Sequence, residues 1–320
     1  MSKFLVSSSP HIQGNNSSGK IMAEVILALL PAAIMGGIVF GAYTYLVILV
    51  SVAAAVLAEA LWQKITGQRV SISDNSAAVT GLLLAMCMPP SIPLWMVAIG
   101  AVFAIIVVKQ LFGGLGHNFM NPALAARAFM LASWPTAMTN WSTPKGGFAV
   151  LGNVDTVSSA TVLSRFKDGI LNTEAVKSFS DLTFITPGCI GETTALLLIL
   201  GGIYLIARRI IRFEIPLAFL ATVFIIGAIS GDGVSALRGA FHVLNGGVLI
   251  AAFFMATDYV TSPMTGRGQL IMGIGCGLIT MIIRLYGGYP EGVTYAILLM
   301  NILTPLIDKI TFPRKYGATR

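Results

Sequence analysis

The densest group of residues that could do chemistry in this sequence is a run of hydroxyl side chains near the middle of the chain. It reads Asp155-Thr-Val-Ser-Ser-Ala-Thr161 and lies between a glycine-rich and a basic stretch. Taken alone, the run predicts a solvated turn whose hydroxyls are open to covalent modification. A plain Ser/Thr loop without any chemistry explains the same residues, so both interpretations stay open at this point.

A second polar group interrupts an apolar region at Gly113-Gly-Leu-Gly-His-Asn-Phe-Met-Asn-Pro-Ala123. Its dipeptide Asn121-Pro122 places a capping side chain and a preset φ at the start of a helix. The free N–H groups and the positive dipole end of such a helix suit an anionic or carbonyl-bearing ligand. An ordinary helix cap accounts for the same two residues equally well.

Other site types find no support in the sequence. His11, His117 and His242 are isolated, and no HxxxH, ExxH or GxSxG pattern occurs. The three cysteines are scattered without CxxC spacing, so this chain alone cannot build a four-thiolate metal or cluster site. Hydrolytic and metal-centred functions are therefore disfavoured.

The elements that position these groups follow from composition. The chain has 320 residues, of which 56% are hydrophobic and 10% charged, which leaves too little polar surface for a water-soluble globule. Disorder, collagen-like repetition and a small disulfide scaffold are excluded as well. Since one crossing needs about 20 apolar residues, the sequence predicts an all-α polytopic membrane protein with roughly ten transmembrane helices.

Apolar runs place these helices along the chain. Six runs are continuous, at 20–40, 43–61, 94–112, 193–206, 216–230 and 270–285. Four more are short or interrupted, at 76–88, 122–134, 237–257 and 292–307. Several of the ten predicted helices are therefore broken.

The two halves of the chain resemble each other. Lys109-Gln-Leu-Phe-Gly-Gly114 and Ile283-Arg-Leu-Tyr-Gly-Gly288 each end a long helix, and a proline opens the next one. Five helices per repeat would make the second repeat inverted, with a central site where the broken helices meet. The predicted segments are a first five-helix repeat (1–134), an extracytoplasmic loop (135–190) and a second five-helix repeat (191–320).

The net charge of +7 predicts orientation and not nucleic-acid binding. With both termini in the cytoplasm, the inner segments hold most of the basic residues, among them Lys64, Lys109 and Arg208. The long loop, which this orientation places outside, balances its basic residues with acidic ones. The positive-inside rule therefore favours cytoplasmic termini and an extracytoplasmic loop.

With these motifs in place, the chain resembles the membrane subunits of the Rnf and sodium-pumping NADH:quinone oxidoreductase complexes. The hydroxyl run is similar to their flavinylation motif, D-x-x-[ST]-G-A-[ST]. Gly113–Ala123, Ala256-Thr-Asp-Tyr-Val-Thr-Ser-Pro263 and Gly287-Gly-Tyr-Pro-Glu-Gly292 are similar to three further signatures. The resemblance covers essentially the whole chain and is closest to the RnfD branch of the family, because the amino-terminal extension usual in the quinone-reducing branch is missing.

The resemblance implies two flavins. Thr161 would carry covalent FMN through a phosphoester, with Asp155 and Ser158 matching the motif. Ser159 stands where the family usually has glycine, and its Cβ restricts φ. Asn118, Asn121, Arg127 and Asp258 would contact a flavin, including a second, non-covalent one such as riboflavin.

The polar residues around Asp258 allow other roles. Thr257, Thr261 and Ser262 lie close to it in sequence. As the resemblance suggests, their oxygen atoms could coordinate sodium or hold the second flavin. They could equally cap a re-entrant turn.

The resemblance also implies the assembly. The chain would be one subunit of an ion-translocating ferredoxin:NAD oxidoreductase in a bacterial or archaeal cytoplasmic membrane, coupling electron transfer to Na⁺ or H⁺ transport. Its partners would be the other membrane and peripheral subunits, one of them bearing FMN, and a flavin transferase. Alone it would have no turnover. The alternative is a non-redox solute channel or secondary transporter, which inverted repeats with broken helices also suit.

Charged groups inside the predicted spans need an explanation, since each costs about 2.5 to 3.5 kcal/mol at the bilayer centre. They are Glu24, Glu59, Arg127, Arg238 and Arg284. Glu59 and Arg284 lie near span ends, where the sequence favours snorkelling to the interface. Arg127 and Arg238 sit in broken segments and are expected to be structural or to face a flavin.

Overall fold

The fold is helical throughout the parts of the chain that the structure describes. The structure is a computed structural model, and it describes residues 17–68, 70–141, 163, 188–192, 194–231, 234–289 and 291–312. Most of the predicted loop 135–190, including Asp155, Ser158, Ser159 and Thr161, lies outside these residues, and so do parts of the three predicted segments. A helix stands at each of the ten predicted places, so the helical assignment is confirmed.

Within the described residues, the first half of the chain forms six α-helices, one 3-10 turn and one π-helical segment. They are α1 (Ser18–Phe40), α2 (Ala42–Ile65), η1 (Ile72–Asp74), α3 (Ser76–Met86), α4 (Leu94–Phe103) with its π-helical continuation η2 (Ala104–Gln110), α5 (Pro122–Ser133) and α6 (Pro135–Met138). The second half contains η4 (Ile190–Glu192), α9 (Ala195–Ala207), α10 (Glu214–Ile229), α11 (Ala236–Leu244), α12 (Val248–Ile250) with its π-helical continuation η5 (Ala251–Met255), α13 (Gly266–Tyr286) and α14 (Val293–Thr311).

Several of these helices can cross a membrane. Helices α1, α2, α13 and α14 are long and apolar enough by themselves, and α11 with α12–η5 forms a pair bent by 69° that meets the same test together. The other apolar helices have 10–17 residues, which is short for a crossing. A multi-pass membrane protein is therefore supported, whereas the count of ten crossings in inverted repeats stays a prediction.

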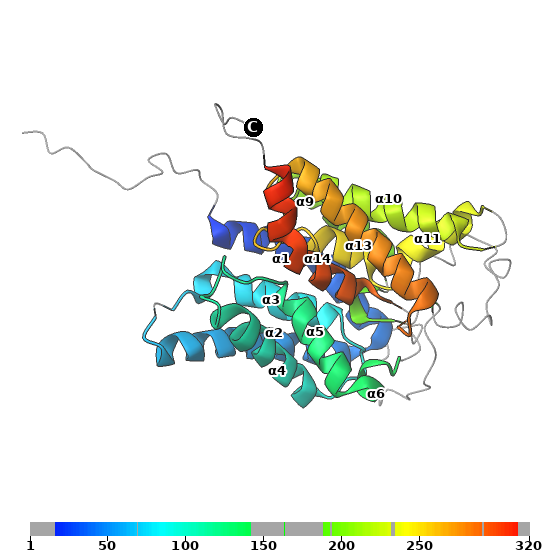
Figure 1. Cartoon of the computed structure of the whole chain (residues 1–320). Coiled ribbons are helices and arrows are strands. Elements are labelled where there is room, and N and C mark those ends of the chain that lie inside the picture. Colours follow the sequence, from blue (N-terminus) through cyan, green and yellow to red (C-terminus); the bar gives the residue numbers. More distant parts are fainter. Residues whose placement is uncertain are drawn as a thin grey trace, which may run out of the picture.

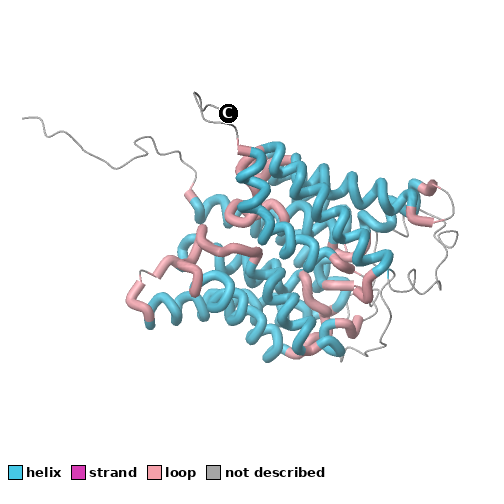
Figure 2. The backbone as a smooth tube through the Cα atoms, in the orientation of Figure 1, coloured by secondary structure: helices cyan, strands magenta, loops and turns pink. Residues whose placement is uncertain are grey.

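Helix neighbours recur in the two halves. Helix α2 packs on α3 and α4, and α10 packs on α11 and α13; likewise α4 packs on α5, and α13 on α14. Figure 1 shows α2 to α6 gathered on one side and α9 to α14 on the other, and Figure 2 shows loops at both ends of the helices. The halves meet where α1 packs on α9 and α5 packs on α14. This recurring arrangement agrees with an internal repeat.

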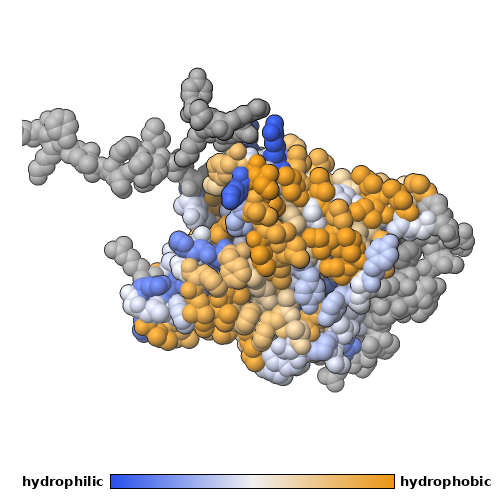
Figure 3. Space-filling model, in the orientation of Figure 1, coloured by the Kyte–Doolittle hydropathy of each residue, from blue (hydrophilic) through white to orange (hydrophobic). Residues whose placement is uncertain are grey.

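Close packing between the halves depends on small residues. A Cβ on Gly201 of α9 would lie 2.5 Å from the carbonyl oxygen of Ala28 in α1, so only glycine fits there. The outer surface carries many large apolar side chains, such as Leu49 and Leu57 of α2 and Leu217 of α10. Figure 3 shows apolar residues over most of the visible face, with strongly hydrophilic ones gathered at its left and top edges. A surface of this kind suits lipid contact.

The break between α11 and α12 is held by an arginine. Gly246 and Gly247 adopt positive φ angles of 74° and 70°, and the chain turns there inside the protein. Arg284 donates hydrogen bonds to the carbonyl oxygens of His242 (2.6 Å), Asn245 (2.9 Å) and Gly246 (3.0 Å). Its guanidinium thereby satisfies carbonyls that a helix would otherwise pair.

The predicted snorkelling of Arg284 is therefore wrong. The residue is only 4% exposed, because its donors are needed at the break. The second predicted snorkelling residue, Glu59, is 1% exposed and also stays inside.

Replacing Arg284 with methionine should destabilise the fold, since three buried carbonyls would lose their donor. We expect a loss in the free energy of unfolding on the order of 3 kcal/mol, measured by unfolding of the purified chain followed through tryptophan fluorescence. Arg267→Met, at an exposed position of α13, is the matched control and should change little. Equal stabilities for the two variants would contradict the role given to Arg284.

Candidate functional site

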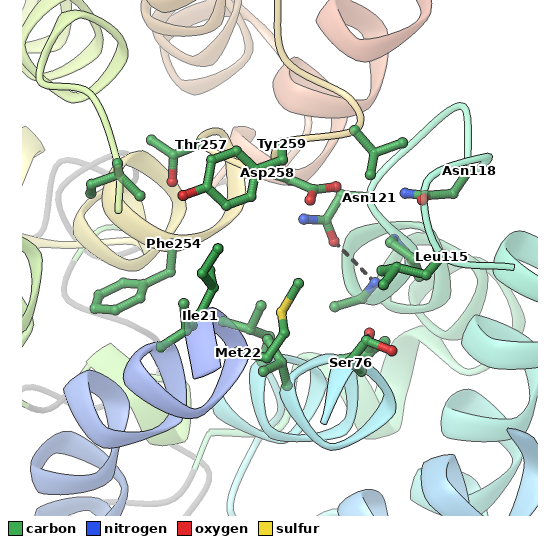
Figure 4. Close-up of a pocket in the computed structure, with 18 of the residues that line it drawn as sticks. Ile21, Met22, Ser76, Leu115, Asn118, Asn121, Phe254, Thr257, Asp258 and Tyr259 are labelled. Atoms are coloured by element: carbon green, nitrogen blue, oxygen red, sulfur yellow. Dashed lines mark hydrogen bonds between the residues drawn. The ribbon is translucent and has the colours of Figure 1, made fainter. Parts of the chain in front are cut away.

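The main cavity lies where the two halves meet. The space not filled by atoms is about 760 Å³, and part of it is open to solvent. Its walls come from the start of α1, the start of α3, the segment 115–123 before and at the start of α5, the end of α9 and the segment 253–260 at the end of η5. In Figure 4, Asn118, Asn121 and Asp258 lie on one side of the space, and Ile21 and Met22 lie on the other.

Asn121 joins the two halves at this cavity. Its Oδ1 accepts hydrogen bonds from the backbone N–H groups of Ala123 (3.0 Å) and Leu124 (3.3 Å). A dashed line marks the first of these in Figure 4. Its Nδ2 donates to the carbonyl oxygen of Met255 at the end of η5 (3.1 Å). The helix-cap interpretation is therefore confirmed. Because the cap occupies these N–H groups, the expectation that they stay free for a ligand is wrong.

Asn118 and Asp258 form the polar side of the cavity. Asn118 donates to the carbonyl oxygen of Met120 (3.1 Å) and also hydrogen-bonds the Asp258 carboxylate. The other side-chain donor to Asp258 is the Thr261 hydroxyl (3.2 Å). Burial raises the pKa of this carboxyl, which lies between η5 and α13, and the hydrogen bonds act in the opposite direction.

The hydroxyls near Asp258 serve the local turn. Thr257 donates to the carbonyl oxygen of Phe253 (2.7 Å), and the N–H of Ser262 donates to the carbonyl oxygen of Asp258 (3.1 Å). These contacts agree with a capped turn. The carboxylate of Asp258 itself still lines the cavity.

A buried charge network borders the same cavity. Lys109 donates to both carboxylate oxygens of Glu59, each at 2.9 Å, and to the hydroxyl of Ser76 at 2.6 Å. Gln110 adds a fourth hydrogen bond to the network, to Glu59 Oε1 at 2.8 Å. Lys109 and Ser76 line the cavity.

Lys109, which the sequence analysis counts among the basic residues of the cytoplasmic segments, lies inside the protein. The side chain is 2% exposed and pairs with Glu59, which stands 50 residues earlier on α2. Glu59 needs no snorkelling because this partner neutralises it inside the protein.

Arg127 lies apart from the main cavity. Its guanidinium forms an ion pair with Glu291 and donates to the sulfur of Cys189 at 3.3 Å. Arg127 and Cys189 line a smaller space of about 250 Å³, together with Glu192 and Gly247. Glu291 lies next to Cys189 and Glu192.

The structure thus divides the predicted site residues into three groups. Asn118, Asn121 and Asp258 line one cavity, and Arg127 belongs to another cluster. The remaining four, Asp155, Ser158, Ser159 and Thr161, lie outside the described residues.

The other charged residues of the spans have structural contacts. Glu24 on α1 accepts hydrogen bonds from Arg208 at 2.6 Å and from Tyr204, which ties α1 to α9. Arg238 on α11 donates to the carbonyl oxygen of Ser230 at 2.8 Å. Neither Glu24 nor Arg238 lines the main cavity.

Sequence reasoning missed Ser76, Lys109, Cys189 and Glu192. One signal was available, because Asn75-Ser76 matches Asn245-Gly246 in the second half and so marked a turn at the start of a half-helix. Glu192 and Cys189 gave no signal, since their neighbours come from distant parts of the chain.

Comparisons with known proteins agree over the whole chain. The profile of the NQR2, RnfD, RnfE family matches residues 5–317. A relative from Acetobacterium woodii, named as the D subunit of a Na⁺-translocating ferredoxin:NAD⁺ oxidoreductase complex, is 49% identical, covering 98% of this chain and 96% of its own. A Clostridium ljungdahlii protein, named as the D subunit of a proton-translocating ferredoxin:NAD⁺ oxidoreductase complex, is 45% identical, covering 99% and 97%. An Escherichia coli protein, named as the D subunit of an ion-translocating oxidoreductase complex, is 37% identical, covering 98% of each chain.

Removing one partner of the Glu59–Lys109 pair should destabilise the protein more than removing both partners together. Glu59→Leu or Lys109→Met alone leaves an unpaired buried charge and should lower the free energy of unfolding by about 3 to 5 kcal/mol. The double variant should cost less than the sum, because neither charge remains. The exposed Lys64→Met serves as the control. Strictly additive losses in equilibrium unfolding would contradict a direct pair.

Proposed function

Because this chain belongs to the NQR2, RnfD, RnfE family, we propose that it is the D subunit of an ion-translocating ferredoxin:NAD⁺ oxidoreductase complex. The match over residues 5–317 confirms the family resemblance seen in the motifs. Relatives that match nearly end to end are named as subunits of such complexes. This full-length likeness favours a redox role over the alternative of a non-redox channel or transporter. It also implies further subunits, without which this chain would not turn over.

Covalent FMN on Thr161 is the first part of the proposal. Its support is the motif from Asp155 to Thr161, which keeps the acid and the hydroxyls of the flavinylation pattern. The residue two positions later, Leu163, is 5% exposed, and a Cβ on Gly246 would come within 3.0 Å of it. The Leu163 side chain is thus packed against the break between α11 and α12.

A non-covalent flavin in the main cavity is the second part. The observation that carries it is a cavity between the two halves of the chain with an apolar side and a polar side. Met22 and Phe254 provide flat or flexible apolar surface for a ring system, while Asn118 and Asp258 offer groups that can hydrogen-bond its edge. A bound flavin would supply electron acceptance and donation there.

The residues around the cavity would hold and orient this group. Lys109 keeps a positive charge at the wall, held in place by Glu59 and Ser76. Asn121 fixes the start of α5 against the end of η5, so the two walls keep their spacing. The apolar residues exclude water, which strengthens the polar contacts.

The remaining parts of the proposal concern ions and orientation. Relatives are named for Na⁺ translocation and for proton translocation, so the coupling ion is one of these two. The distribution of lysine and arginine supports cytoplasmic termini and an extracytoplasmic loop. A flavin transferase acting on Thr161 would then work on the outer side of the membrane.

Covalent attachment can be tested on a denaturing gel. The wild-type chain, produced together with a flavin transferase, should carry flavin fluorescence that survives denaturation, and Thr161→Ala should abolish it. Thr156→Ala, inside the same run, is the control and should keep the signal. A dark wild-type band would favour the channel interpretation.

The non-covalent flavin can be tested in the Thr161→Ala background, where no covalent flavin interferes. Asn118→Leu or Asp258→Leu should lower the acid-released flavin per chain about tenfold at limiting flavin, since each removes one hydrogen-bonding group. Gln68→Leu, at an exposed position away from the cavity, should retain full occupancy. Unchanged occupancy in both cavity variants would remove the main cavity from the proposal.

Orientation can be tested with an engineered thiol. Cys87, Cys189 and Cys276 are free but buried, so an impermeant maleimide should report mainly on a new cysteine. Val150→Cys should be labelled in intact cells and protected in inside-out vesicles. Labelling solely from the cytoplasmic side would reverse the orientation.

A further inference from the structure

Two glutamates from distant parts of the chain meet beside Arg127. Glu192 ends η4, and Glu291 precedes α14. One carboxylate oxygen of each residue and the sulfur of Cys189 lie within 4.8 Å of one another. At such a separation, like charges disfavour each other's ionisation.

The donors around this pair are already engaged. Arg127 donates to Oε2 of Glu291 and to the sulfur of Cys189. Cys189 donates to the carbonyl oxygen of Cys87 at 3.1 Å and also hydrogen-bonds the Glu192 carboxylate. Arg284, the other cation facing the pair, donates to backbone carbonyls, including that of Glu291 at 3.0 Å.

In this arrangement, one carboxylate oxygen of each glutamate lacks a hydrogen-bond donor among the described residues. Oε1 of Glu192 and Oε1 of Glu291 are both buried, and neither has a hydrogen-bond partner among the residues that the structure describes. Glu192 as a residue is partly exposed, and the Glu291 side chain is 14% exposed. The two Oε1 atoms are nevertheless buried, so they face the interior of the protein. An ionised carboxylate oxygen buried without a donor is strongly unfavourable.

Space for a small occupant is present. The adjoining cavity of about 250 Å³ is lined by Glu192, Cys189 and Arg127. Gly247 contributes to it, because a Cβ at this position would stand 3.0 Å from Oε1 of Glu192. The cavity can therefore place a water molecule beside Glu192.

We propose that Glu192 and Glu291 form a site that binds one proton between them. A hydronium ion transfers its proton to one Oε1 and leaves as water, and the resulting O–H can donate toward the other carboxylate, directly or through a water. Arg127 balances the single negative charge that remains. A metal cation fits less well, because Arg127 already occupies one oxygen of Glu291 and brings a positive charge to the site.

The test is the infrared spectrum of the purified full-length chain in lipid nanodiscs as pH is raised. The wild type should show a carboxylic-acid C=O band at neutral pH that is lost at alkaline pH. Glu192→Gln and Glu291→Gln should each abolish this band, since removing one carboxylate frees the other to ionise. Glu24→Gln, which alters an acid already paired with Arg208, should leave the band intact.

Other outcomes decide against the site. No acid band at neutral pH in the wild type, or a band that survives both Gln variants, would overturn the proposal. A band whose pH midpoint moves with sodium concentration would overturn the proton assignment in favour of sodium. Should a Gln variant fail to fold, Glu192→Asp keeps an acid and must shift the band; an unmoved band would exclude Glu192.

Discussion

The interaction on which the structure depends is the pairing of backbone groups where helices break inside an apolar protein. Water is scarce there, so each free carbonyl must find a donor within the chain. Arg284 supplies donors at the break between α11 and α12, and Asn121 supplies one at the end of η5. Without these side chains, the breaks would leave buried polar groups unpaired.

The same contacts create the places where chemistry is possible. Because Asn121 caps α5 and also holds the carbonyl of Met255, the polar ends of two helices from different halves face one cavity. Lys109 and Glu59 neutralise each other at its edge, which keeps a positive group in the interior at a tolerable cost. Further along α5, Arg127 takes part in the cluster with Glu291. Stability and site construction therefore share residues.

The sequence predicts where helices lie better than what their polar residues contact. Apolar runs and the Asn121-Pro122 signal located the helices and one cap, since both are local properties. The role of Lys109 was missed because a lysine at the end of an apolar run is typical of a membrane boundary, and its partner lies on α2. The role of Arg284 was missed because it too is a basic residue near the end of an apolar run, and the carbonyls it binds lie at the end of another helix. Glu192 and Cys189 meet Glu291 only through folding, so no local pattern could identify them.

The central claim is that this chain carries flavin, and mass spectrometry of the purified wild-type chain tests it most directly. The chain is produced with its flavin transferase and weighed intact, first under native and then under denaturing conditions. The account predicts a mass increase of one esterified FMN that persists after denaturation and maps to the peptide containing Thr161, and one further flavin lost on denaturation. A chain that has the mass of its bare sequence in both conditions would contradict the account.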